Sequence, residues 1–143
     1  MQIHRNPSHG AAKRLLTECN LPTSDLDAAR FESFFGCGRK DDLNGIVGVE
    51  LHGQVALLRS LAVAPGVRGT GCGRALVGEA ERYAWAHGVK EIYLLTTTAE
   101  NFFSALGYRR IERASVPEAI QNTSEFSGLC PSSSALMVKN LGG

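Results

Sequence analysis

The sequence predicts an α/β (α+β) fold with a mixed, mostly antiparallel central sheet flanked by helices. The first observation is that strand-like and helix-like patterns alternate along all 143 residues. The second is an antiparallel meander of three successive strand patterns, at residues 31–37, 45–51 and 55–63, which disfavours a doubly wound fold. The third is that no repeat and no long linker divides the chain, so residues 1–143 form a single domain.

Composition limits the kinds of partner. The chain is 43% hydrophobic and 20% charged, as expected of a globular protein. The formal net charge is +1 and the 15 Lys and Arg residues are dispersed, which argues against nucleic acid and an anionic membrane as partners. No apolar run reaches the roughly 18 residues of a membrane span, and the polar N-terminus lacks a signal-peptide core. We therefore expect a cytoplasmic protein.

The N-terminal third begins with a short edge strand at residues 2–5. Apolar residues at helical spacing predict a helix over residues 11–19. A second short helix is expected up to about Arg30, with Thr23 or Ser24 as its N-terminal cap.

The meander follows. Residues 31–37 and 45–51 form its first two strands, with a turn at residues 40–42 between them. His52 and Gly53 are expected to form a hairpin turn. The third strand, residues 55–63, is the longest apolar one and is therefore expected in the middle of the sheet.

The second half alternates helices and strands. A glycine-rich turn at residues 68–73 leads into a helix that ends at His87, with Gly88 as its stop. One face of this helix is expected to carry Cys72, Leu76, Ala80, Tyr83 and His87, with Ala75 and Ala84 beside them. The remaining elements are a strand at 91–96, a helix at 99–106 stopped by Gly107, a strand at 108–111, a helix at 116–126 started at Ser115 with Pro117 in its first turn, and a strand at 136–139.

The glycine-rich turn at residues 68–73 is the most informative segment. Backbone N–H groups at the start of a helix lack internal partners, and the helix dipole adds partial positive charge there. Glycines let successive amides converge on one anion, and Arg68 can add a charged contact. Three glycines at every second position beside an arginine exceed what a plain strand-to-helix turn needs. The segment therefore indicates a phosphate or pyrophosphate site.

Two standard phosphate motifs do not fit this turn. A P-loop requires Lys followed by Ser or Thr after its last glycine, and here Arg74 and Ala75 follow. The dinucleotide pattern GxGxxG fails as well, because Arg74 or Leu76 occupies the position of the third glycine.

A family resemblance indicates which ligand the glycine-rich turn binds. The pattern Arg68-x-x-Gly71-x-Gly73, after the strand end at residues 59–63, resembles the acetyl-CoA motif of the Gcn5-related N-acetyltransferases. Residues 102–108, Phe-Phe-Ser-Ala-Leu-Gly-Tyr, are similar to the aromatic end of a later helix in that family. The two motifs occur in the family's order and with its usual separation. The resemblance implies the acyl-CoA N-acyltransferase fold and acetyl-CoA as co-substrate.

A narrower resemblance comes from the C-terminal third. Residues 102–108, 116–120, 124–126 and 129–131 together resemble the small acetyltransferases of bacterial arsenic-resistance operons. This resemblance implies a toxic or metabolic small amine as the acetyl acceptor.

The family resemblance also assigns a cofactor site. The main chain of Leu61 and Val63 would pair with the pantetheine amides, and the amides from Arg68 through Arg74 would hold the pyrophosphate. The backbone of Leu61 would stabilise the oxyanion as a neutral amine attacks directly, with no covalent enzyme intermediate. The implied acetyl-CoA contacts are Leu61, Ala62, Val63, Arg68, Gly69, Thr70, Gly71, Cys72, Gly73, Arg74, Asn101 and Phe103.

The sequence departs from the family where proton transfer is concerned. Phe103 stands where many relatives have a tyrosine acid, and Leu57 stands where some have a glutamate base. Neither replacement can exchange protons, so either positioning and a water chain suffice or another group serves. Leu61, Ser60 and Tyr93 are the predicted catalytic set, and the acid–base candidates left open are Glu50, Ser60, Tyr93, Asn101 and Cys130.

Two residues are candidates for binding the acceptor. Arg59 interrupts an apolar strand, so it is either a fork for an acidic group of the substrate or the partner of a structural carboxylate. Cys130 lies in a Pro/Ser-rich turn that could cover the substrate pocket, or it is a small packed residue.

Competing functions remain open. Phe103 and Leu57 favour a catalytically silent acyl-CoA-binding regulatory module as the alternative. A thiol-based arsenic or metal binder would require the four dispersed cysteines to converge, and their spacing predicts no metal site. A small-molecule amine is the expected partner, and a homodimer is an assembly that many relatives adopt.

Overall fold

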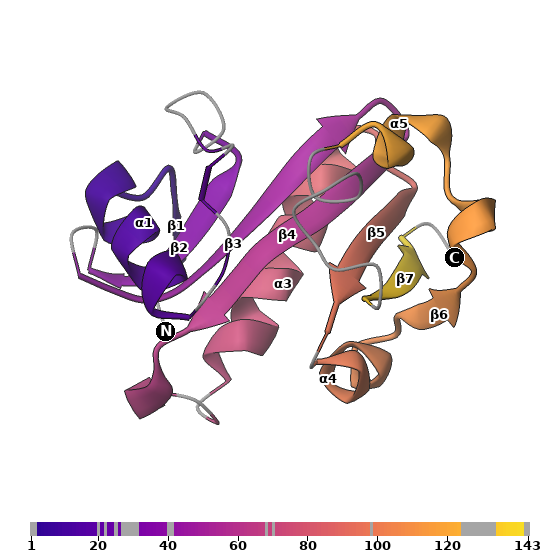
Figure 1. The fold of residues 1–143 in the computed structure, drawn as a ribbon. Helices are drawn as coiled ribbons and strands as arrows, with labels where there is room; N and C mark the ends of the chain where they lie inside the picture. The colour runs from indigo at the N-terminus through magenta and orange to yellow at the C-terminus, as the bar shows by residue number, and fades with distance from the viewer. Residues whose placement is uncertain are drawn as a thin grey trace.

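The computed structural model describes residues 3–19, 21, 23, 24, 26, 32–39, 42–67, 69, 71–97, 99–123 and 134–141. Seven strands form one sheet in the order β1-β2-β3-β4-β5-β7-β6 (Figure 1). The strands are β1 (Ile3–Arg5), β2 (Phe34–Arg39), β3 (Asp42–His52), β4 (Val55–Val63), β5 (Glu91–Thr96), β6 (Arg109–Ile111) and β7 (Ala135–Asn140). The helices are α1 (His9–Glu18), α3 (Cys72–Ala86), α4 (Glu100–Ala105) and α5 (Glu118–Gln121), with 3-10 turns η1 (Pro65–Val67) and η2 (Arg113–Ser115).

The sheet is mixed, as predicted. Strands β1 to β4 form an antiparallel meander, β4 pairs with β5 in parallel, and β7 pairs antiparallel with both β5 and β6. The long apolar strand β4 lies in the middle of the order, because it is buried on both faces and needs cover from both sides.

Helices cover both faces of the sheet. On one face α3 and α4 pack in a core that includes Leu76 and Phe103, while on the other face α1 contributes Leu16 and α5 contributes Ile120. Figure 1 shows α3 behind the sheet and α1 in front of it. Leu16, Leu76 and Ile120 are 0% exposed, and truncating such a side chain to alanine typically costs about 2–5 kcal/mol.

The strands at 55–63 and 91–96 match β4 and β5. Other boundaries need correction. Helix α1 begins at His9, two residues before the predicted start, and β2 begins at Phe34, three residues after it. The hairpin turn consists of Gly53 and Gln54 rather than His52 and Gly53, because His52 still pairs with Val55.

The predicted helix at 116–126 is shorter in the structure. Ser115 belongs to η2 and Pro117 is the N-cap of α5, which spans Glu118–Gln121. Residues 124–133 lie outside the described residues, as does most of the predicted helix that ends at Arg30. Of the predicted turn at 40–42, only Asp42 is described, and it opens β3.

The buried face of α3 is rotated relative to the prediction. Its buried residues are Cys72, Leu76, Val77, Ala80 and Ala84. Tyr83 is only half-buried and His87 is exposed. A helix lying on a sheet buries a stripe wider than one row of i, i+4 neighbours, and here the second row runs through Val77 and Ala84.

Within the described ranges, no helix is both long and apolar enough to cross a bilayer.

Candidate functional site

The central parallel pair of strands opens along its length. Strand β4 pairs with β5 only at its start, through Val55–Glu91, Ala56–Ile92 and Leu57–Tyr93. Along the described part of β5, no ladder continues to residues 58–63 of β4. The two strands therefore diverge, and the main-chain groups along this edge of residues 58–63 are not used by β5.

A β-bulge lies in the open half of β4. Ile46 pairs with Ala62 and Gly48 pairs with Arg59, so two residues of β4, Ser60 and Leu61, lie opposite the single residue Val47. Ser60 has φ +59°, in the left-handed region that a residue with a Cβ adopts at a cost of about 1–2 kcal/mol.

The bulge changes which side chains face which side of the sheet. Before it, Ala56 and Leu58 pack in the core under α3, while Leu57 packs on the opposite face with α5. After it, Leu61 and Val63 face the α3 side. Regular alternation would have placed both with Leu57. The extra residue therefore sets which backbone groups of β4 face the gap.

The gap is part of a cavity of about 670 Å³ that extends from β4 to the first turn of α3. Its lining residues come from the end of α1, from β4, from the glycine-rich turn and from α4: Cys19, Leu21, Leu61, Ala62, Val63, Gly69, Gly71, Cys72, Gly73, Arg74, Ala99 and Phe102. The volume is in the range of small-molecule and cofactor sites.

The glycine-rich turn is built to present amides. Gly69 and Gly71 have φ of +83° and +89°, and a Cβ on either would meet no atom within 4 Å. Backbone conformation therefore requires these glycines, while the space beside them is open. Gly71 is the N-cap of α3 and its carbonyl accepts the N–H of Ala75 at 3.0 Å. The N–H groups of the preceding three residues, 72–74, have no partner within the helix and lie at the cavity.

An aromatic ring closes the cavity beside the turn. A Cβ on Gly73 would lie 3.3 Å from the Phe102 ring, and Phe102 is 37% exposed and lines the cavity. Phe103, the predicted contact, is 5% exposed and packs in the core with its ring centroid 5.5 Å from that of Tyr108. Asn101 is exposed on α4 and is not among the lining residues. In a helix as short as α4, sequence periodicity does not tell which of two adjacent aromatic residues faces inward.

Three thiols lie in and near the cavity. Cys72 is buried, lines the cavity and contacts the side chain of Cys37 on β2. Burial, together with Cys37, raises the pKa of Cys72 to about 12, so this thiol stays protonated at neutral pH. The Cys19 sulfur lies 3.9 Å from the carbonyl oxygen of Val63. In the part of the chain that the structure describes, no group of three or more His, Cys, Asp or Glu residues could hold a metal ion.

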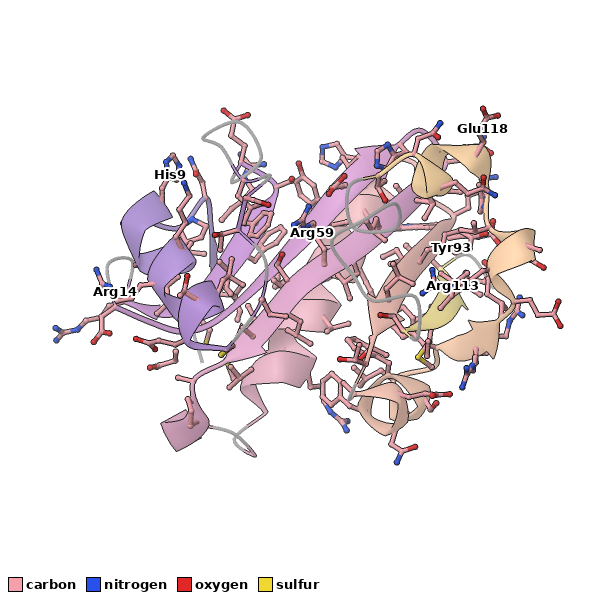
Figure 2. The ribbon with its side chains drawn as sticks, viewed as in Figure 1. His9, Arg14, Arg59, Tyr93, Arg113 and Glu118 are labelled. Atoms are coloured by element: carbon pink, nitrogen blue, oxygen red, sulfur yellow. The ribbon has the colours of Figure 1, made fainter. Side chains whose placement is uncertain are left out.

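Arg59 and Ser60, two predicted site residues, are not among the residues that line the cavity, but they bond to each other beside it. The Arg59 side chain is 0% exposed, and Nη1 lies 2.7 Å from Oε2 of Glu50, whose side chain is 11% exposed. Its Nε donates to the Ser60 hydroxyl at 3.1 Å. His52 Nε2 lies 3.5 Å from the other carboxylate oxygen of Glu50. Of the two roles predicted for Arg59, the structure shows the pairing with a structural carboxylate, and that carboxylate is Glu50. Figure 2 shows Arg59 over the centre of the sheet.

Tyr93 lies on the face of the sheet that carries α5, in the same apolar cluster as Leu57. Burial and the neighbouring Glu91 carboxylate raise its pKa above the usual 10, and Arg109 partly opposes this shift. At neutral pH the phenol therefore holds its proton. Tyr93 is not among the residues that line the cavity.

The structure brings together most of the predicted acetyl-CoA contacts. Leu61, Ala62, Val63, Gly69, Gly71, Cys72, Gly73 and Arg74 all line the cavity. Arg68, Thr70 and Cys130 lie outside the described residues. Four further residues line the cavity although the sequence did not predict them there: Cys19, Leu21, Ala99 and Phe102. Cys19 and Leu21 carry no sequence signal for this role, because they reach the cavity only through the packing of α1 on the sheet.

Comparison with known proteins gives the family. The acetyltransferase (GNAT) family matches residues 7–110. An uncharacterised N-acetyltransferase of Chlorobaculum tepidum is 35% identical over 88 residues, which cover 61% of this chain and 56% of that protein. The chain thus spans little more than half of the length of this curated relative.

Solved structures show the same fold. N-acetylglutamate synthase from Neisseria gonorrhoeae, complexed with coenzyme A and N-acetylglutamate, superposes with a TM-score of 0.83 at 17% identity, covering 98% of this chain and 35% of that one. A GNAT-family acetyltransferase from Staphylococcus aureus Mu50 superposes with a TM-score of 0.74 at 17% identity, covering 98% of both chains. The chain belongs to the GNAT family and has its fold, as the sequence predicted.

Proposed function

We propose that the protein is an N-acetyltransferase that moves the acetyl group of acetyl-CoA to the amine of a small, acidic or amino-acid-like molecule. The observation that carries the proposal is the cavity between the open half of β4 and the first turn of α3. One end offers strand-edge groups that suit the pantetheine amides, and the other offers the N–H groups at Gly71 to Arg74 that suit a pyrophosphate. Family membership and a CoA-bound structural neighbour support this ligand.

The reaction needs no covalent enzyme intermediate. The neutral amine attacks the thioester carbonyl, a C–N bond forms, the C–S bond breaks, and the sulfur leaves as a thiolate that takes up a proton. The backbone of Leu61, at the bulge and on the cavity wall, is the proposed stabiliser of the oxyanion. Holding both reactants in line supplies much of the rate enhancement.

Ser60 and Tyr93 are the proposed acid–base residues. The Ser60 hydroxyl accepts a hydrogen bond from Arg59, which leaves its own hydrogen to be donated. Tyr93, with its raised pKa, can serve at neutral pH only as a proton donor. Phe103 and Leu57 are buried and carry no proton to exchange, so water is the natural acceptor of the ammonium proton.

One comparison supports an acidic acceptor, whereas Arg59 does not: its side chain is 0% exposed, is paired with Glu50 and is not among the residues that line the cavity. The neighbour from Neisseria gonorrhoeae holds N-acetylglutamate, an acetylated acidic amino acid. The narrower resemblance to acetyltransferases of arsenic-resistance operons adds amino-acid-like phosphinates and arsinates as candidates. Cys130 is a further proposed acceptor contact, and a homodimer remains a prediction for sedimentation analysis.

A second function is a catalytically silent acyl-CoA-binding regulatory module. It is favoured by Phe103 and Leu57, which replace the proton-exchanging groups of many relatives. The two functions share the cavity and differ only in turnover.

The deciding experiment titrates acetyl-CoA into the protein and follows thiol release with a panel of small amines, including acidic amino acids, phosphinates and arsinates. Release that depends on one amine would establish the enzyme, and a lower KM for acidic amines than for neutral ones would support an acidic acceptor. Tight acetyl-CoA binding without turnover would favour the regulatory module. Absence of binding would overturn the assignment of the cavity.

A further inference from the structure

The bulge in β4 needs something to hold it, because Ser60 is a residue with a Cβ in the left-handed region, at φ +59°. Such a conformation persists when neighbouring groups fix it. The structure shows what those groups are. Arg59 Nε donates to the Ser60 hydroxyl at 3.1 Å, and the contact is buried.

This contact exists only in the bulged conformation. In a regular strand, adjacent side chains point to opposite faces of the sheet, so Arg59 and Ser60 could not meet. At a bulge the alternation is interrupted, and the two side chains lie close enough to bond. The Arg59–Ser60 hydrogen bond therefore stabilises the bulged backbone relative to the regular one.

Arg59 is itself held in place from the neighbouring strand. Glu50 lies opposite Leu57, so it is a diagonal neighbour of Arg59 on the same face of the sheet. Its carboxylate binds Arg59 Nη1 at 2.7 Å, and His52 lies 3.5 Å from its other oxygen. With a 0% exposed guanidinium, this ion pair leaves the arginine little freedom to move away from Ser60.

We propose that Arg59 is a positioning residue: held by Glu50, it fixes the left-handed backbone of Ser60 and so presents the main chain of Leu61 and Val63 to acetyl-CoA. The proposal rests on the proposed function, since it concerns the same cavity. It differs from a substrate fork because the arginine acts on acetyl-CoA affinity, through Ser60, and does so with no acceptor amine present.

The test is a double-mutant cycle on acetyl-CoA affinity, measured by calorimetric titration without amine. Arg59→Lys keeps a cation for Glu50 but loses the Nε donor, so the dissociation constant for acetyl-CoA should rise about tenfold or more, as for loss of one hydrogen bond to a charged group. Ser60→Gly adopts the left-handed backbone without a side-chain anchor, so Arg59→Lys should change affinity less than about twofold in that background.

Ser60→Ala completes the set. It removes the hydroxyl but keeps the Cβ, so it should weaken acetyl-CoA binding as Arg59→Lys does. Ser60→Gly, which lacks the Cβ, should bind acetyl-CoA more tightly than Ser60→Ala. Equal effects of Arg59→Lys with Ser60 and with Gly at position 60 would overturn the proposal. So would an effect of Arg59→Lys confined to the KM of the amine, which is the outcome expected of a substrate fork.

A matched control separates positioning from general loss of stability. Glu81 on α3 resembles Glu50, because it too lies off the cavity lining and its carboxylate accepts hydrogen bonds, from Lys139 at 2.9 Å and from the Tyr108 hydroxyl at 3.0 Å. Its partners are therefore Lys139 and Tyr108, whereas the partner of Glu50 is Arg59. Glu50→Gln should weaken acetyl-CoA binding, whereas Glu81→Gln should leave it within about twofold. If both weaken it equally, positioning through Arg59 is overturned. If the unmodified protein binds no acetyl-CoA, the proposed function itself has failed, and the two failures are distinguishable.

Discussion

Gly45 on β3 lies directly against Cys72, the first residue of α3. A Cβ on Gly45 would be 2.6 Å from the Cys72 sulfur and 2.9 Å from the nearest carbon of the Leu76 side chain. Helix α3 therefore approaches the sheet at its N-terminus more closely than any residue with a side chain at position 45 would allow. This approach places the first turn of the helix beside the open half of β4.

Gly45→Ala should displace the start of α3. We expect a loss of about 1–3 kcal/mol in the free energy of unfolding, as for an overpacked core, and weaker acetyl-CoA binding. Denaturant unfolding and calorimetric titration measure the two effects. Gly10 is the control, because a Cβ there meets no atom within 4 Å in the first turn of α1, so Gly10→Ala should be neutral or stabilising. Unchanged acetyl-CoA affinity in Gly45→Ala would contradict the link between the close approach of α3 to the sheet and acetyl-CoA binding.

Gly71→Ala should weaken acetyl-CoA binding through the backbone. The residue has φ +89°, so alanine costs about 1–2 kcal/mol and tilts the amides of the first turn of α3. Gly88 is a closely matched control: its φ is +88°, a Cβ there also meets nothing within 4 Å, and it lies at the other end of α3. Both variants should lose similar stability, and only Gly71→Ala should lose affinity. Equal affinities for acetyl-CoA would argue against an anion site at this turn.

Cys19 should be protected from alkylation by CoA. It is half-buried, lines the cavity and lies 3.9 Å from the carbonyl of Val63. With saturating CoA, iodoacetamide labelling of Cys19, followed by peptide mass spectrometry, should slow several-fold. In Gly71→Ala the same protection should require more CoA. Labelling at an unchanged rate in saturating CoA would show that the ligand lies elsewhere.

Alkaline pH should destabilise the protein through Cys72. The folded state raises its pKa from 9.0 to about 12, so the unfolded chain releases this proton first. The contribution of Cys72 is fully present below about pH 9 and is lost as the pH rises toward 12, by at most about 1.4 kcal/mol per pH unit. Tyr108, whose pKa is also raised by burial and Glu81, adds to the loss above about pH 10.

Cys72→Ala tests this dependence. Denaturant unfolding at several pH values between about 8 and 10 should show a shallower fall in stability than in the unmodified protein, even if the alanine variant starts lower. Parallel curves for the two proteins would mean that the Cys72 thiol is not the group responsible.

Much of the candidate site could be predicted from the sequence, because it depends on local backbone conformation. Glycines at positions 69, 71 and 73 after an apolar strand specify a turn with converging amides, whatever the remainder of the fold does. The boundaries of β4 and β5 followed from continuous apolar runs, which only a doubly covered strand tolerates.

Other features depend on contacts between segments that lie far apart in the chain. No glycine in the sequence marks the position of the bulge at Ser60. The hydrogen bond between Arg59 and Ser60 follows from the register of β3 against β4, which places the bulge there. The same register selects Glu50 as the partner of Arg59. The choice of Phe102 over Phe103 at the cavity wall depends on how α4 packs against the core.

The sequence by itself determined the family, the mixed sheet and the position of the glycine-rich turn, because patterns of apolar residues and glycines act over a few neighbouring residues. Tertiary structure alone decided where β4 diverges from β5, that the thiols of Cys37 and Cys72 lie in contact, and which carboxylate pairs with Arg59. These relationships join residues between 9 and 44 positions apart or on separate strands and helices, such as Glu50 with Arg59 and Cys19 with Val63. Their physical cause is the packing of elements around one core, which no local pattern encodes.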